Sequence, residues 1–140
     1  MSEYTKHLTP RPELRERIIE TAVKAFAAQG IKSITMDDIA TSLGISKRTL
    51  YEVFPDKETL LEECILRGQK EGDEYLKNVL ATSENVLEVL LKCYQRSIEK
   101  FHATNKKFFE DIKKYPKAYK LMTKRHDQDS EETVNFFKEG

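Results

Sequence analysis

The chain has 140 residues, with 24 basic and 24 acidic side chains and no tryptophan. A formal net charge of zero excludes a strong overall field toward nucleic acid or membranes, so any DNA affinity must come from a local patch. No apolar run approaches the length of a membrane span, and we expect no signal peptide. Cys64 and Cys93 lie in apolar helical patterns, which predicts reduced, buried thiols rather than a disulfide. A cytoplasmic protein of one domain or two small ones is expected.

The first 29 residues divide into a tail and a helix. Residues 1–10 are polar and lack periodicity, which predicts a flexible tail, although Lys6 and Arg11 could also form an arm in a DNA minor groove. Pro12 suits the first turn of a helix, and Gly30 is expected to end it. The apolar positions of this helix are Leu14, Ile18, Ile19, Ala22, Val23 and Phe26.

Residues 35–54 predict two short helices joined by a glycine turn. Thr35 is a good N-cap, and Asp38 follows three residues later, close to a capping box. Gly44 gives the backbone freedom that ends the first helix, and Ser46 caps the second. The apolar positions expected to face the core are Met36, Ile39, Ala40, Leu43, Leu50, Val53 and Phe54.

The opposite side of the second short helix carries Arg48 and Glu52, flanked by Lys47, Thr49 and Tyr51. Lysine and arginine suit phosphates and guanine, while hydroxyl and phenol groups suit phosphate oxygens. A helix, a glycine turn and a second helix form the layout of a helix-turn-helix DNA reader, whose second helix enters the major groove. An ordinary helical hairpin with a solvated face remains the alternative, because the motif class is common.

A fourth helix is predicted from Lys57 to about Leu80, since Pro55 breaks the third and Asp56 can cap the next. A cation in a first helical turn is explained if an anion lies nearby, so Lys57 is a candidate phosphate ligand as well as a candidate solvated lysine. The predicted buried stripe comprises Leu60, Leu61, Cys64, Ile65, Leu76, Val79 and Leu80.

The remaining sequence predicts more helices and no strand. Thr82 or Ser83 is expected to cap a helix over residues 84–103, whose wide apolar face predicts packing on two sides. Shorter helices are expected from Asn105 and from Pro116. Three apolar residues near the end need a partner, which indicates a dimer contact or later helices outside the chain. They are Val134, Phe136 and Phe137.

The run from Ile18 to Leu61 resembles the N-terminal domain of the tetracycline-repressor (TetR/AcrR) family of bacterial transcription regulators. The matching pieces are residues 18–22 with Phe26 and Gly30, then 35–40, 43–51 and 54–61. The resemblance implies an all-helical, dimeric repressor, whose N-terminal domain reads an operator half-site and whose C-terminal domain binds a small molecule and pairs the subunits.

The resemblance also implies roles for single residues. The positions that commonly touch phosphates match Thr35, Ser46, Tyr51 and Lys57, and those that approach bases match Lys47, Arg48 and Thr49. Val53 departs from the family, which often has an aromatic residue or histidine there, and the helical pattern makes it a core residue. Glu52 is unusual on a DNA face, where it could accept from cytosine N4 or repel phosphates.

We therefore expect an all-α protein with a flexible tail (1–10), a helix-turn-helix DNA-binding domain (11–56) and a helical ligand-binding and dimerisation domain (57–140), incomplete at its C-terminus. A small-molecule pocket is hypothesised between the later helices, although plain core packing is the favoured interpretation for any single candidate. The candidates are Cys64, Ile65, Tyr94, Ile98, Phe101, Phe109 and Met122.

The leading hypothesis is a sequence-specific regulator, a repressor that binds an operator in double-stranded DNA as a homodimer and is released by a small-molecule effector. His7, His102 and His126 have no metal-ligand spacing, so no metal or cofactor is expected. A helical interaction module without an operator is the main alternative. A small enzyme is disfavoured because no catalytic motif is present.

Overall fold

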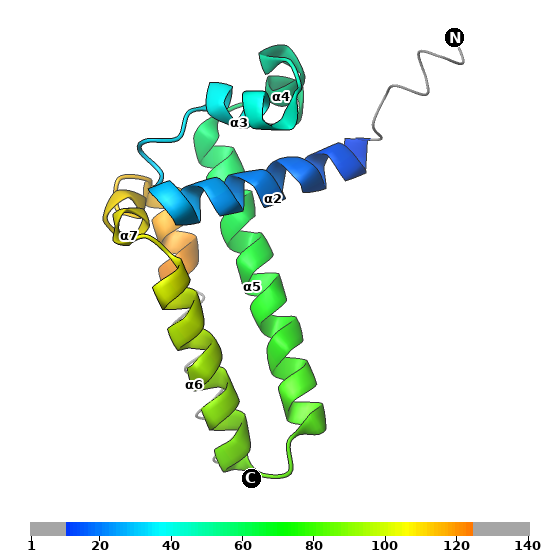
Figure 1. The fold of residues 1–140 in the computed structure, drawn as a ribbon, viewed down its shortest axis with the longest axis vertical. Coiled ribbons are helices and arrows are strands. Elements are labelled where there is room, and N and C mark those ends of the chain that lie inside the picture. The colour runs from blue at the N-terminus through cyan, green and yellow to red at the C-terminus, as the bar shows by residue number, and fades with distance from the viewer. Residues whose placement is uncertain (1–10, 125–140) are drawn as a thin grey trace, which may run out of the picture.

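The computed structural model describes residues 11–124, and every regular element in that range is an α-helix (Figure 1). This confirms the predicted fold class. The helices are α2 (Arg11–Gln29), α3 (Met36–Leu43), α4 (Lys47–Val53), α5 (Lys57–Thr82), α6 (Val86–Ala103) and α7 (Lys106–Ile112), followed by a helical segment at residues 116–124. The predicted tail and the C-terminal apolar residues Val134, Phe136 and Phe137 lie outside the described residues.

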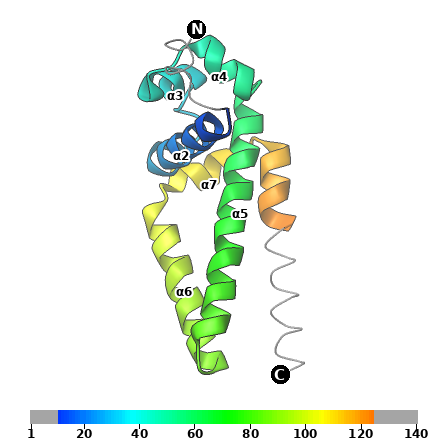
Figure 2. The ribbon, with the colours of Figure 1, turned by 90° about the vertical axis from the view of Figure 1, so that its right-hand side faces the viewer.

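The first three of these helices form a head at one end of the long helix α5 (Figures 1 and 2). Helix α5 runs away from the head, α6 returns beside it in the opposite direction, and α7 lies against the end of α2. The segment 116–124 is held against α5, where Gln69 Nε2 donates a hydrogen bond of 3.0 Å to the carbonyl oxygen of Leu121. None of the helices between residues 11 and 124 combines the length and the apolar character needed to cross a lipid bilayer.

The core of the head draws on more of the chain than α2, α3 and α4. Ile18 and Phe26 of α2, Ile39 of α3 and Leu50 of α4 are almost fully buried, as the helical patterns predict. Helix α5 adds Leu60, Leu61 and Cys64 to the same cluster, and the later segments add Ile112 and Ala118. The core of the head therefore includes residues from α7 and from the segment at 116–124, which come much later in the sequence.

Local capping explains where the head helices begin. Thr35 Oγ1 accepts a hydrogen bond of 3.0 Å from the backbone N–H of Asp38, and Asp38 Oδ2 accepts one of 2.9 Å from the N–H of Thr35, so the predicted capping box is confirmed. Gly44 ends α3 with φ of 69°, in the left-handed region that glycine tolerates. Ser46 Oγ then accepts from the N–H of Thr49 at 3.1 Å and starts α4.

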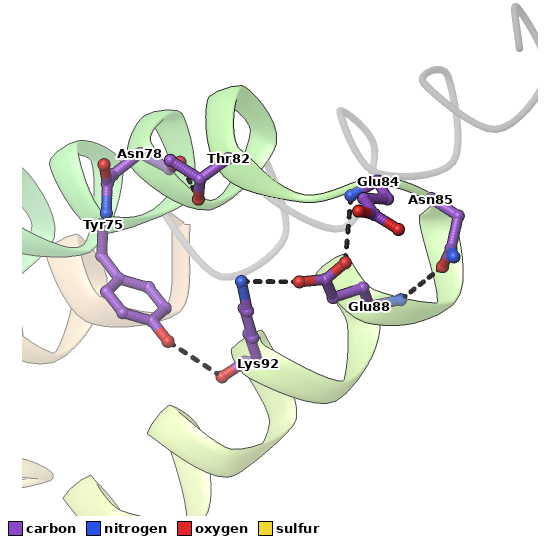
Figure 3. Close-up of polar contacts among 7 residues, drawn as sticks. All are labelled: Tyr75, Asn78, Thr82, Glu84, Asn85, Glu88 and Lys92. Carbon is purple, nitrogen blue, oxygen red and sulfur yellow. Dashed lines mark hydrogen bonds and ion pairs between the residues drawn. The ribbon is translucent and has the colours of Figure 1, made fainter.

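The prediction that Thr82 or Ser83 caps α6 is wrong, because both belong to the end of α5. The N–H of Ser83 continues the α5 ladder to a carbonyl one turn back, and Thr82 Oγ1 also donates backward along α5. Asn85 is the true cap, since its Oδ1 accepts from the N–H of Glu88 at 2.9 Å. Glu88 Oε2 in turn accepts from the N–H of Glu84 at 3.0 Å, which fixes the tip of the hairpin (Figure 3).

Most apolar side chains of α6 are exposed, and its half-buried residues are Glu88, Val89, Lys92, Cys93 and Arg96, so the prediction that it packs on two sides is wrong among the described residues. Tyr75 of α5 donates from its hydroxyl to the carbonyl of Lys92 at 3.2 Å (Figure 3), and the Arg96 guanidinium carbon lies 4.9 Å from the Tyr75 ring centre. Tyr94 and Phe101, on the opposite side, are 65% and 63% exposed. Leu80 of α5, which the helical pattern predicts to be buried, is also exposed.

Candidate nucleic-acid interface

Helix α4 is short, and its orientation is fixed by the side chains that it buries. Leu50 and Phe54 are buried in the head, and Val53 is half-buried against the same cluster, which confirms that Val53 is a core residue. A helix of seven residues is not stable alone in water, so this packing holds it in place. The opposite side of α4 must therefore face away from the protein.

That outward side is the reading face, which we define as Lys47, Arg48, Thr49, Tyr51 and Glu52. All except the half-buried Thr49 are exposed, and the Arg48 side chain is 90% exposed. The Thr49 hydroxyl lies 2.8 Å from Ser46 Oγ, within hydrogen-bond distance. Helix α4, which carries the reading face, lies in the head, at the end of the molecule opposite the α5–α6 hairpin tip (Figure 1).

The two predicted phosphate contacts at helix starts, Thr35 and Ser46, are exposed and lie at the N-caps of α3 and α4. Thr35 Oγ1 accepts a hydrogen bond in the capping box, so its own O–H proton can still donate to a phosphate oxygen. Tyr51, 40% exposed, adds a phenol hydroxyl on the reading face. The structure therefore brings the expected hydroxyl donors to one end of the head.

Lys57 begins α5 beside this surface but is half-buried. Its ammonium nitrogen lies 5.9 Å from the ring centre of Tyr115, within the range of a cation–π contact. Burial lowers the pKa of Lys57, while the nearby carboxylates of Asp111 and Asp38 oppose that shift. The proximity of Asp38 places Lys57 near the first turn of α3, close to the other candidate phosphate contacts.

Both cations of the reading face are paired with carboxylates. Lys47 Nζ lies 3.3 Å and 3.5 Å from the two carboxylate oxygens of Asp37 on α3. Arg48 Nε lies 3.5 Å from Glu52 Oε1, one turn later on α4. Sequence reasoning missed Asp37, because the angle at the Gly44 turn decides which residue of α3 faces α4, and no linear spacing reveals that angle.

The seven candidate pocket residues do not surround one cavity within residues 11–124. Cys64 is buried with its Sγ donating to the carbonyl of Ile19 at 3.9 Å, and burial raises the pKa of its thiol to about 12. Ile65 and Met122 pack against the same head core. The other four do not belong to that core: three are exposed on α6, and Phe109 on α7 is half-buried, with its ring stacked on Phe101 at 5.5 Å between ring centres. They are Tyr94, Ile98, Phe101 and Phe109.

A groove of about 430 Å³ lies between α2 and α5, and its lining is mostly charged. Ion pairs cross it between Arg15 and Glu63, at 2.7 Å, and between Arg67 and Glu16. None of the seven candidate pocket residues lines this groove. Across residues 11–124, histidine, cysteine and carboxylate side chains form no group of three that could hold a metal ion.

Residues 18–64 match the family described as bacterial regulatory proteins, tetR family. Over 72 residues the chain is 32% identical to IcaR of Staphylococcus aureus, the negative transcriptional regulator of the biofilm operon icaADBC; the match covers 51% of this chain and 37% of IcaR. It is also 32% identical over 101 residues to the HTH-type transcriptional regulator YhgD of Bacillus subtilis, covering 69% of this chain and 52% of YhgD. The chain thus spans between a third and about half of the length of these curated relatives.

Solved structures agree with the fold. GusR of Salmonella enterica superposes with a TM-score of 0.70 at 24% identity, covering 86% of this chain and 64% of GusR. A tetR-family regulator from Mesorhizobium loti gives 0.65 at 23% identity, covering 84% and 62%. The family match covers α3 and α4, the capping box and the reading face. Residues 18–64 are therefore a helix-turn-helix segment that matches the tetR family of bacterial regulatory proteins, and the fold around them is the one seen in these solved structures.

Proposed function

We propose that this protein is a sequence-specific DNA-binding transcriptional regulator, a homodimeric repressor that a small molecule releases from its operator. The observation that carries the proposal is the outward, cation-bearing side of α4, held on a buried helical platform within the tetR-family segment. The similarity to IcaR, named as a negative regulator, supports repression rather than activation. A protein that binds a chromosomal operator acts in the bacterial cytoplasm.

In this mechanism α4 lies in the major groove, where one set of residues contacts phosphates and another contacts base edges. Thr35, Ser46, Tyr51 and Lys57 contact phosphates, which sets the position of the helix on the duplex. Arg48 and Lys47 donate to guanine, Thr49 contacts a base edge, and Glu52 accepts from cytosine N4. Two copies would place their α4 helices about 34–36 Å apart, so that both enter successive major grooves on one side of the DNA.

Release by a ligand requires a connection between the reading face and the rest of the chain, and α5 supports one. Helix α5 begins at Lys57 beside the head and runs to Thr82 at the hairpin tip, so a change in its tilt moves the head (Figure 2). A ligand that favours one tilt by a few kcal/mol is sufficient to shift the equilibrium. The exposed aromatic residues of α6 and the half-buried Phe109 remain its candidate contacts.

The test is selection of bound fragments from random duplex DNA, followed by titration of the selected operator with variants. Lys47→Ala and Arg48→Ala are expected to relax sequence preference, while Lys57→Ala weakens binding to all DNA about equally. Lys77→Ala, on α5 away from the head, is the matched control and is expected to change neither property. Failure to enrich any sequence, or a preference unaltered by both reading-face variants, would refute the proposal.

The exposed apolar side of α6 favours a second candidate function, a helical interaction module without an operator. The salt dependence of binding distinguishes the two. A DNA reader loses affinity steeply as salt rises, because cations that neutralise phosphates release counterions. An apolar helix contact keeps or gains strength at high salt.

A further inference from the structure

We propose that Asp37 and Glu52 set the specificity of DNA binding by holding Lys47 and Arg48 in ion pairs, so that these cations are released to a matching base sequence and not to any phosphate. The inference rests on the proposed function. It assigns Asp37, which lies on α3 outside the reading face, a positioning role that acts through Lys47. It gives Glu52 a positioning role through Arg48, in addition to any direct base contact.

The first pair links the two helices of the motif. Lys47 is the first residue of α4, and Asp37 lies in the first turn of α3, on the other side of the Gly44 turn. Both carboxylate oxygens lie within 3.5 Å of Lys47 Nζ, and the two side chains are 60% and 64% exposed. The ammonium is thus directed toward the Asp37 carboxylate on α3.

The second pair orients a guanidinium. Glu52 lies one turn after Arg48, with its Oε1 3.5 Å from Arg48 Nε, and the Arg48 side chain is 90% exposed. The two terminal nitrogens of an arginine guanidinium can donate side by side to guanine O6 and N7. The exposed Arg48 guanidinium can therefore still contact a base, while the Glu52 carboxylate beside it weakens its attraction to phosphates.

Charge balance gives the two pairs their common effect. Lys47 and Arg48 contribute two positive charges, and Asp37 and Glu52 contribute two negative charges, so these four side chains together carry no net charge. Sequence-independent attraction to DNA depends on uncompensated cations, so Lys47 and Arg48 add little to it while they are paired. Exposed ion pairs are also weak, so the contacts to a correct base sequence are sufficient to replace them.

The experiment compares Asp37→Asn and Glu52→Gln with the wild-type chain on two probes, a random-sequence duplex and the operator selected by the wild type. Fluorescence anisotropy across a salt series gives affinity and its salt slope for each. Each variant is expected to bind random duplex about three to ten times more tightly, with a slope steeper by about one, because one more cation contacts phosphate. Operator affinity rises less, so the ratio of operator to random affinity falls.

Three control measurements distinguish the release of a paired cation from a general change in charge or folding. Glu99→Gln removes the same charge from an exposed site on α6 and is expected to leave both affinities unchanged. Asp37→Glu keeps the charge and is expected to retain most of the wild-type ratio. A thermal melt of each variant detects loss of structure, which would weaken binding to both probes equally and would not steepen the salt slope.

The inference is overturned if random-duplex affinity and slope are unchanged in both variants, or if Glu99→Gln raises them as much. In those cases a wild-type chain that still selects an operator retains the proposed function. A wild-type chain that selects no sequence and shows no salt-dependent DNA binding refutes both proposals together. The two failures are therefore distinguished by the wild-type titration alone.

Discussion

Gly30 and Gly44 both have a positive φ, of 86° and 69°, but they have different neighbours. A Cβ added to Gly30 would lie 2.7 Å from Lys107 Cβ on α7, whereas one added to Gly44 would meet nothing within 4 Å. We expect Gly44→Ala to lower the free energy of unfolding by about 1 kcal/mol, the cost of a left-handed residue. Gly30→Ala should cost more, because α7 must also move. Urea denaturation measures both, and equal losses would contradict the predicted difference.

Two capping carboxylates predict how stability depends on acidity. The backbone N–H groups of Thr35 and Thr59 donate to Asp38 and Asp56, and these hydrogen bonds lower the pKa of each carboxyl below its ordinary value of 3.8. A lowered folded-state pKa gives stabilisation above the unfolded pKa that is lost as the pH falls through the folded one. The melting temperature should therefore fall in acid below about pH 4.

The matched variant for this prediction replaces both carboxyls, as Asp38→Asn with Asp56→Asn. It removes the two groups whose protonation weakens the caps, so it should be less stable at neutral pH and lose less on acidification. Melting curves recorded from neutral to acid pH give both quantities. A variant that loses as much in acid as the wild type would show that other carboxylates control the acid transition.

Helix α7 is attached to the end of α2 by polar contacts between segments about 80 residues apart in the sequence. Asp111 Oδ2 accepts from the backbone N–H groups of Ile31 and Lys32, at 3.0 and 2.9 Å. The N–H of Asn105 donates to the carbonyl of Ala27 at 2.7 Å. The C-terminal half of the described chain is therefore joined to the head through α2 as well as through α5.

Removing the Asp111 acceptor tests this attachment. Asp111→Ala leaves two backbone N–H groups without their acceptor, so we expect the free energy of unfolding to fall by about 1–3 kcal/mol. Asp111→Asn keeps one side-chain oxygen and should lose less. Chemical denaturation of the two variants gives the comparison, and an alanine variant as stable as the wild type would mean that water replaces the carboxylate without cost.

The elements that sequence reasoning places well are those whose signals are local. The capping box of Thr35 and Asp38, the Gly44 turn and the packing of Val53 against the core follow from short spacings along one helix. Lys47 faces Asp37 only because of the angle between α3 and α4, which no short spacing encodes. The outward apolar face of α6 escapes prediction for the same reason, because an apolar stripe indicates that a face favours contact but not which neighbour it meets.

At the scale of the whole molecule, the family segment and the folding unit do not coincide. Residues 18–64 carry the motif, but Ile112 and Ala118 are fully buried in the same core. A fragment covering 11–64 would expose the surface that these residues cover, and a domain of that size has little stability to lose. We expect the fragment to show no cooperative thermal transition by circular dichroism, whereas 11–124 melts cooperatively. A cooperative melt of the short fragment would show that the head folds alone.

The burial of Cys64 makes it a reporter of how often the molecule opens. Only a thiolate reacts with an alkylating reagent, and burial keeps Cys64 both covered and protonated, whereas Cys93 on α6 is half-buried. Alkylation of Cys64 should therefore wait for α2 and α5 to separate, while Cys93 reacts sooner. A bound operator stabilises the closed state by mass action, so it should slow labelling at Cys64 and leave Cys93 unaffected. Mass spectrometry of the two peptides over time would then measure DNA occupancy without a label on the DNA.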